Sequence, residues 1–270
     1  MSNTIEGVHF KFLKHNLGLN EYVSNWGVLS ESGRKPIRIF IFHQMIKFLS
    51  HLQESESSLL QEALKVNMNL SGIGFRSWAS YISQILESVQ FEAAPNDLED
   101  SIAGHLGTIR SKFDNTFLIN WQSHKEHLAN NPQSKLQMYA QMTNDTFQIA
   151  PYVLCVTNYK IRNSICRFRL SAHNLPIETM RYLKIPRNLR FCPFCCSCVG
   201  DEKHYFLDCQ NPNIALSRSK LFSHPLISNS LTTNTDNLQE QLISFFRHTD
   251  PTVLLEIGKH IMTIESEFKA

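Results

Sequence analysis

Residues 192–209 read CPFCCSCVGDEKHYFLDC, and this stretch decides how the C-terminal half of the chain is interpreted. Its Cys and His residues follow the spacing C-x2-C-x8-H-x4-C, formed by Cys192, Cys195, His204 and Cys209. Two cysteines three positions apart can hold one side of a metal ion from a tight turn, and a His and a Cys five positions apart can complete a tetrahedron. Four soft ligands of this kind predict a closed structural Zn2+ site with no position left for a substrate.

Other cysteines leave alternatives open within the same stretch. Five of the seven cysteines lie between 192 and 209, so chance clustering explains them poorly. Cys196 and Cys198 lie in the same loop, and either one is an alternative to Cys195 as a ligand. A second interpretation, buried or disulfide-bonded cysteines, requires an oxidising compartment. Residues 1–20 carry scattered charges and no continuous apolar segment, so we expect no signal peptide and an intracellular protein, nuclear or cytoplasmic.

Composition indicates a folded chain with an uneven charge distribution. The 270 residues suffice for one large or two ordinary domains, and 42% hydrophobic with 19% charged residues is typical of globular proteins. No apolar run approaches the ~18 residues that a membrane crossing needs, so we expect no membrane partner. Residues 160–190 contain eight basic residues against Glu178 alone, a local net charge of +7, whereas the whole chain carries +2. The positive charge is therefore concentrated directly before the Cys/His motif.

Apolar residues recur at helical spacing along most of the chain and strand signals are weak, so we expect a mainly α fold. Helices are predicted over 37–52, 58–66, 78–89, 98–128, 135–142, 159–170, 215–222, 238–246 and 253–268, and a loop over 67–74. Ser32 is the predicted cap of the first of these helices, and residues 95–97 precede the long one. We expect three domains: a helical region over 1–150, a basic segment with the Cys/His motif over 151–227, and C-terminal helices over 228–270.

Several of these segments together resemble one family. RFRLSAHNLPIETMRY (residues 167–182), IPR (185–187) and RFCPFC (190–195) resemble the region beyond the polymerase domain of non-LTR (LINE-type) retrotransposon reverse transcriptases, where a basic segment leads into a CCHC zinc knuckle. GDEKHYFLDC (200–209) is similar to the family's closure of that knuckle. ESGRKPI (31–37) resembles the family's thumb-side sequence, which implies a thumb-like or connector role for residues 1–150.

The resemblance implies a fragment that binds nucleic acid and has no catalytic centre of its own. It departs from the family at Met180, where relatives usually carry Gly. The sequence contains no Asp-Asp dipeptide of the polymerase type, no acidic cluster for two catalytic Mg2+ ions and no endonuclease constellation, so we expect no enzyme. By resemblance, the fragment would hold template RNA or target DNA during target-primed reverse transcription, with a reverse transcriptase core supplied elsewhere.

The predicted nucleic-acid contacts are basic residues that would bind phosphates and aromatic residues that would stack on unpaired bases. They are Arg162, Arg167, Arg169, Arg181, Arg187, Arg190, Phe194 and Tyr205. The aromatic residues could equally cover the small core of the zinc site. The alternative function is a helical protein-interaction scaffold, in which residues 36–130 bind a partner and the zinc site is purely structural.

Overall fold

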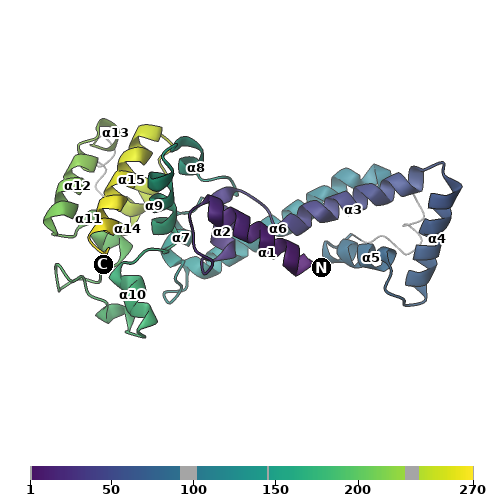
Figure 1. The fold of residues 1–270 in the computed structure, drawn as a ribbon, viewed down its shortest axis with the longest axis horizontal. Helices are drawn as coiled ribbons and strands as arrows, with labels where there is room; N and C mark the ends of the chain where they lie inside the picture. The colour runs from purple at the N-terminus through teal and green to yellow at the C-terminus, as the bar shows by residue number, and fades with distance from the viewer. Residues whose placement is uncertain (1, 92–101, 145, 229–236, 270) are drawn as a thin grey trace. The chain divides into compact units, whose positions relative to one another are not determined.

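The structure is a computed structural model that describes residues 2–91, 102–144, 146–228 and 237–269. These residues are mainly α-helical, which confirms the predicted fold class (Figure 1). They form two compact units, each with its own interior. The first unit comprises residues 1–6 and 35–124, and the second comprises residues 7–34 and 125–270. The three predicted domains, with boundaries after 150 and after 227, stay a prediction.

The first unit is built on an apolar cluster shared by three helices. Its elements are α3 (Ile37–Glu54), α4 (Ser58–Gly72), α5 (Trp78–Ser88), η1 (Ile102–His105) and most of α6 (Leu106–Ala129). Ile46 of α3, Ile82 and Leu86 of α5, and Ile109 and Phe113 of α6 are buried together. They recur at helical spacing, so each helix turns an apolar stripe toward the others. This confirms the predicted helices over 37–52 and 78–89.

Two local predictions for the first unit are wrong, and a third lies outside the described residues. Ser32 is the last residue of α2 (Asn25–Ser32), and α3 begins after Pro36 instead. The predicted loop over 67–74 is helical to Gly72. Met68 packs against the core of the first unit, and this burial stabilises a further turn of α4. The proposed cap at 95–97 falls in a segment that the structure does not describe.

The second unit holds the Cys/His motif. Its elements are most of α1 (Ser2–Asn16), α2, α7 (Gln137–Met142), α8 (Pro151–Cys155), α9 (Tyr159–Arg169), α10 (Pro176–Tyr182), η2 (Arg187–Leu189), α11 (Glu202–Leu207), α12 (Pro212–Phe222), α13 (Pro225–Ser228), α14 (Leu238–Phe246) and α15 (Pro251–Ser266). One continuous apolar core joins them, and Phe168, Phe206 and Phe245 are among its most buried side chains. None of the described helices in either unit combines the length and apolar character that a membrane crossing requires.

A glycine sets the distance between α9 and α15, which lie side by side in Figure 1. A Cβ atom at Gly258 would lie 2.2 Å from Ile161 Cγ2 and 3.0 Å from Ile165 Cδ1. Gly258→Ala should therefore destabilise the protein by about 1–3 kcal/mol through overpacking, although alanine is the better helix former. Thermal unfolding measures this. A Cβ atom at Gly7 of α1 would meet no neighbouring side chain within 4 Å, so Gly7→Ala should instead stabilise by up to about 1 kcal/mol. Equal effects of the two substitutions would contradict the packing argument.

Candidate metal centre

A short hairpin positions the first two cysteines. Phe191 and Val199 form an isolated antiparallel bridge, and the N–H of Cys192 donates to the Cys198 carbonyl at 2.8 Å. The N–H of Cys196 donates back to the Cys192 carbonyl at 2.8 Å, which closes a tight turn. Because these bonds fold the chain back over a few residues, Cys192 and Cys195 lie on one side of the turn. We call residues 191–209 the Cys/His loop.

The short helix α11 positions the other two residues. Asp201 caps it, since the Asp201 carboxylate accepts the N–H of His204 at 2.9 Å. The N–H of Cys209 donates to the His204 carbonyl at 2.8 Å as the helix ends. This tight ending brings Cys209 back beside His204, on the side that faces the hairpin.

The four predicted ligands meet at one point. One side-chain atom from each of Cys192, Cys195, His204 and Cys209 lies within 4.8 Å of the others. Cys209 Sγ is 3.8 Å from Cys192 Sγ and 3.9 Å from Cys195 Sγ. His204 Nε2 is buried and has no hydrogen-bond partner among the described residues. An orphaned imidazole nitrogen beside three sulfurs is a set of donors that could hold a metal ion.

The second imidazole nitrogen faces a carboxylate that the sequence analysis missed. His204 Nδ1 lies 3.7 Å from Asp208 Oδ2. Metal-bound histidines commonly direct their other nitrogen at a carboxylate, which fixes the tautomer and the orientation of the ring. The signal was present in the sequence, because Asp208 follows His204 by four positions, which is about one helical turn.

The electrostatics of the sulfurs favour a bound cation. Burial raises the pKa of Cys209 to about 12, and the neighbouring sulfurs of Cys192 and Cys195 raise it as well. For Cys192, burial also raises the pKa, but the Tyr205 hydroxyl and nearby backbone N–H groups more than offset this, so its pKa falls below the usual value. Three thiolates this close repel one another, and a cation among them removes that cost.

The remaining cysteines of the loop are placed differently. Cys196 is exposed, and its Sγ lies 3.6 Å from the Pro193 carbonyl, away from the four-residue cluster. Cys198 shares a second, three-residue group with His204 and Asp208, so it stays an alternative ligand. All seven cysteines are free in the structure.

The Cys/His loop is part of the core of the second unit. Cys192, Tyr205, Phe206 and Cys209 are fully buried. The Phe206 ring packs against other rings of the core, and its centroid lies 4.9 Å from that of the His260 ring. Tyr205 was predicted to stack on a base, and this prediction is wrong, because a side chain without solvent exposure cannot reach a nucleic acid. Its ring contacts Phe268 at 4.9 Å instead.

Three of the predicted phosphate-binding arginines have carboxylate partners, namely Arg167, Arg169 and Arg181. Arg169 is buried, and its guanidinium donates to Glu31 Oε1 from Nη2 at 2.9 Å and from Nε at 3.0 Å. Arg167 donates to both oxygens of Glu265, at 2.8 and 3.2 Å. The prediction of a phosphate contact is wrong for Arg169, since it is both inaccessible and neutralised. Arg167 remains partly exposed, but its charge is already paired.

The other predicted arginines, together with Arg181, lie nearer the solvent. Arg162 Nη1 donates to the Val156 carbonyl at 3.3 Å, and Arg187 Nη1 donates to the Pro132 carbonyl at 3.4 Å. Arg190 donates to two backbone carbonyls. Arg181 pairs with Glu178, whose Oε2 lies 3.0 Å from Arg181 Nη2. Phe194 is 41% exposed, although one side of its ring meets Phe268 at 5.5 Å.

No protein-family model, curated protein or solved structure matches this chain. The resemblance to retrotransposon reverse transcriptases therefore stays a prediction that rests on the quoted residues.

Proposed function

We propose that Cys192, Cys195, His204 and Cys209 bind one Zn2+ ion in a structural site. Around a tetrahedral zinc ion with Zn–S bonds of about 2.3 Å, two sulfurs are separated by about 3.8 Å. The Sγ–Sγ separations of 3.8 and 3.9 Å in the structure fit this value, and His204 Nε2 would supply the fourth donor. The metal would cross-link the hairpin to His204 of α11 and to Cys209, two residues after the helix. Because four protein donors fill the coordination sphere, no position is left for a substrate.

A nearby arginine suits the charge of such a site. A zinc ion with three thiolates and a neutral imidazole carries a net charge of −1. Arg218 Nη2 donates to the Cys209 carbonyl at 2.9 Å, which holds a positive charge beside the sulfurs. The pKa of Arg218 is lowered by burial and raised by Cys209, Asp208 and Cys195. This placement supports a site that is anionic when it is loaded.

For the chain as a whole, we propose a non-catalytic nucleic-acid-binding module of the post-polymerase retrotransposon type. The observation that carries this proposal is a set of arginines in the basic segment 160–190 whose side chains are held by backbone carbonyls and so retain their charge. Among the described residues, the hydrogen-bond partners of Arg162, Arg187 and Arg190 are neutral backbone carbonyls. Phe191, Phe194 and the strongly exposed Tyr182 lie in the same stretch of chain and offer ring faces. Cations and aromatic rings together are the usual means of holding single strands.

The test uses single-stranded RNA and DNA and their duplexes, all with hydroxyl ends, in fluorescence-anisotropy titrations at two salt concentrations. Arg162→Gln, Arg187→Gln and Arg190→Gln combined should weaken single-strand binding at least tenfold at low salt. Removing three phosphate contacts should also reduce the slope of log K against log salt by about 2. The two effects together would identify these side chains as phosphate contacts.

A charge-matched control removes three exposed cations from the first unit, with Lys47→Gln, Lys65→Gln and Arg76→Gln. This variant should bind as the unaltered chain does. Equal losses in both triple variants would mean that only net charge matters, and unchanged binding in the first would contradict the proposed surface.

One observation favours the alternative function of a protein-interaction scaffold. None of the fifteen residues of α4 is buried, and its exposed apolar side chains include Leu59, which is 76% exposed. Ile73, just after the helix, is 71% exposed. A chain that contains zinc but binds no nucleic acid at low salt would favour this alternative, and α4 would then be the first surface to alter.

A further inference from the structure

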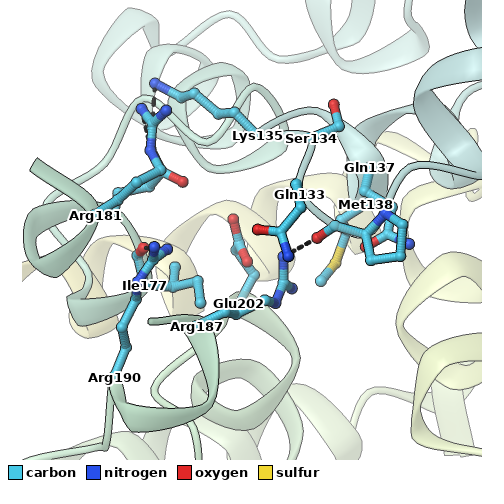
Figure 2. Close-up of a pocket in the computed structure, with 12 residues that line it drawn as sticks. Gln133, Ser134, Lys135, Gln137, Met138, Ile177, Arg181, Arg187, Arg190 and Glu202 are labelled. Carbon is cyan, nitrogen blue, oxygen red and sulfur yellow. Dashed lines mark hydrogen bonds and ion pairs between the residues drawn. The ribbon is translucent and has the colours of Figure 1, made fainter. Parts of the chain in front are cut away.

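A cavity of about 140 Å³ lies in the second unit, outside the metal cluster. One wall is formed by residues 132–138, which comprise a turn and the start of α7, and the other by α10, the segment that follows it and Glu202 of α11 (Figure 2). Its charged lining side chains are Lys135, Glu178, Arg181, Arg187, Arg190 and Glu202. Pro132 and Gln133 are exposed at its rim, so a ligand can enter from solvent.

The two carboxylates of the cavity already have partners. Glu178 Oε2 lies 3.0 Å from Arg181 Nη2 and 3.5 Å from Lys135 Nζ. Glu202 Oε1 accepts the Ser171 hydroxyl at 2.8 Å and lies 2.9 Å from His173 Nε2. Both carboxylates therefore have hydrogen-bond or ion-pair partners other than Arg187 and Arg190.

The remaining arginines are oriented by neutral groups. Arg190 Nε donates to the Ile185 carbonyl and Arg190 Nη1 to the Ile177 carbonyl, each at 2.8 Å. Arg187 reaches across to the turn before α7, where its Nη1 donates to the Pro132 carbonyl at 3.4 Å (Figure 2). Carbonyl groups fix a guanidinium without neutralising it. Four cations and two carboxylates leave the lining with a net charge of +2.

We propose that this cavity binds a phosphate monoester, namely the phosphorylated end of a polynucleotide. An apolar cavity of about 150 Å³ in another protein holds benzene, which has six heavy atoms, and a phosphate group has five. A phosphate monoester carries about −1.5 to −2 charges at pH 7, which matches the lining, whereas a backbone diester carries one. Guanidinium groups also present paired donors that fit phosphate oxygens. The polynucleotide source of the phosphate rests on the proposed function.

The experiment compares 12-nucleotide single strands of one sequence that differ only in the end group. In the first pair, the strands carry a 5′-phosphate or a 5′-hydroxyl, and the fluorophore is at the 3′ end. In the second pair, the strands carry a 3′-phosphate or a 3′-hydroxyl, and the fluorophore is at the 5′ end. The metal-loaded chain should bind one phosphorylated strand about tenfold more tightly than its hydroxyl counterpart. Arg187→Gln should reduce that preference to twofold or less, because it removes one of the two unpaired cations.

Lys184→Gln is the matched control, because Lys184 is an exposed cation of the same segment and does not line the cavity. It should leave the preference intact. Arg190→Gln is a second pocket variant, and its zinc content and melting temperature show whether the loss of two carbonyl bonds has disturbed the fold. A preference that survives both pocket variants would overturn the assignment.

Two further outcomes separate this inference from the proposed function. Strands that bind tightly but without any end preference would overturn the cavity assignment and leave nucleic-acid binding intact. Calorimetric titration with inorganic phosphate tests whether the cavity binds phosphate when no strand binds. If no strand binds, yet phosphate binds and Arg187→Gln abolishes this, the cavity is a free-phosphate site and the nucleic-acid proposal fails. Absence of binding by strands and by phosphate would overturn both.

Discussion

Cys209→Ser is expected to lose the zinc ion and to unfold most of the second unit. Zinc binding to small Cys/His sites contributes about 10–16 kcal/mol, which is comparable to the whole stability of a typical domain, about 5–15 kcal/mol. Cys192 and Cys209 are fully buried in the same core as Phe206, so a vacated site leaves close thiols and an orphaned imidazole nitrogen inside the protein. Metal analysis of the purified chain should give about one zinc per molecule, and the variant should contain almost none and lose its cooperative thermal transition. A strong chelator should have the same effect on the unaltered chain.

Cys196→Ser is the matched control, since Cys196 is an exposed cysteine of the same loop and lies outside the cluster. It should keep both the metal and the melting temperature. Cys198→Ser decides the remaining alternative, because it should be harmless if Cys195 is the ligand and damaging if Cys198 replaces it. Loss of zinc from Cys209→Ser with no change in melting would show that the site is not structural.

The parts of this fold that follow from local patterns were predictable. Helix α9 spans Tyr159–Arg169 against a predicted 159–170, because Asn158 caps it and Ile161, Ile165 and Phe168 recur on one face. The four-residue metal cluster was predictable for the same reason. Its ligands all lie within eighteen residues, so ligand type and spacing nearly determine their geometry.

The carboxylate partners of the basic residues could not be predicted from the sequence. Eight cations before the Cys/His loop could be counted, but Arg169 is neutralised by Glu31, 138 positions away. Arg167 is likewise paired with Glu265 from the last helix. A local count of charge records an excess and contains no information on such distant pairs. The same limitation hid Lys135, which joins Glu178 at the cavity from a turn more than forty residues earlier.

The buried pair of Arg169 and Glu31 leads to the second large prediction. Besides its two bonds to Glu31, the Arg169 guanidinium lies over the rings of Tyr139 and Tyr152, and the Tyr152 hydroxyl donates to Glu31 Oε2. Arg169→Met leaves a carboxylate in the core without its counter-charge, which costs about 3–5 kcal/mol. For a unit of this size, the melting temperature should fall by on the order of 10 °C.

The double variant Glu31→Gln with Arg169→Met should be clearly more stable than Arg169→Met alone. The double variant removes both charges, so no unpaired carboxylate is buried and no charge has to be desolvated on folding. The glutamine oxygen still accepts the hydrogen bond from the Tyr152 hydroxyl. Arg167→Met is the control at a less buried pair, and it should cost less than Arg169→Met because the Arg167 side chain is 35% exposed and that of Arg169 only 7%. Chemical denaturation of the unaltered chain, Glu31→Gln, Arg169→Met and the double variant measures the coupling between positions 31 and 169. If the double variant is as unstable as the single one, lost packing of the arginine side chain, and not the unpaired carboxylate, explains the cost.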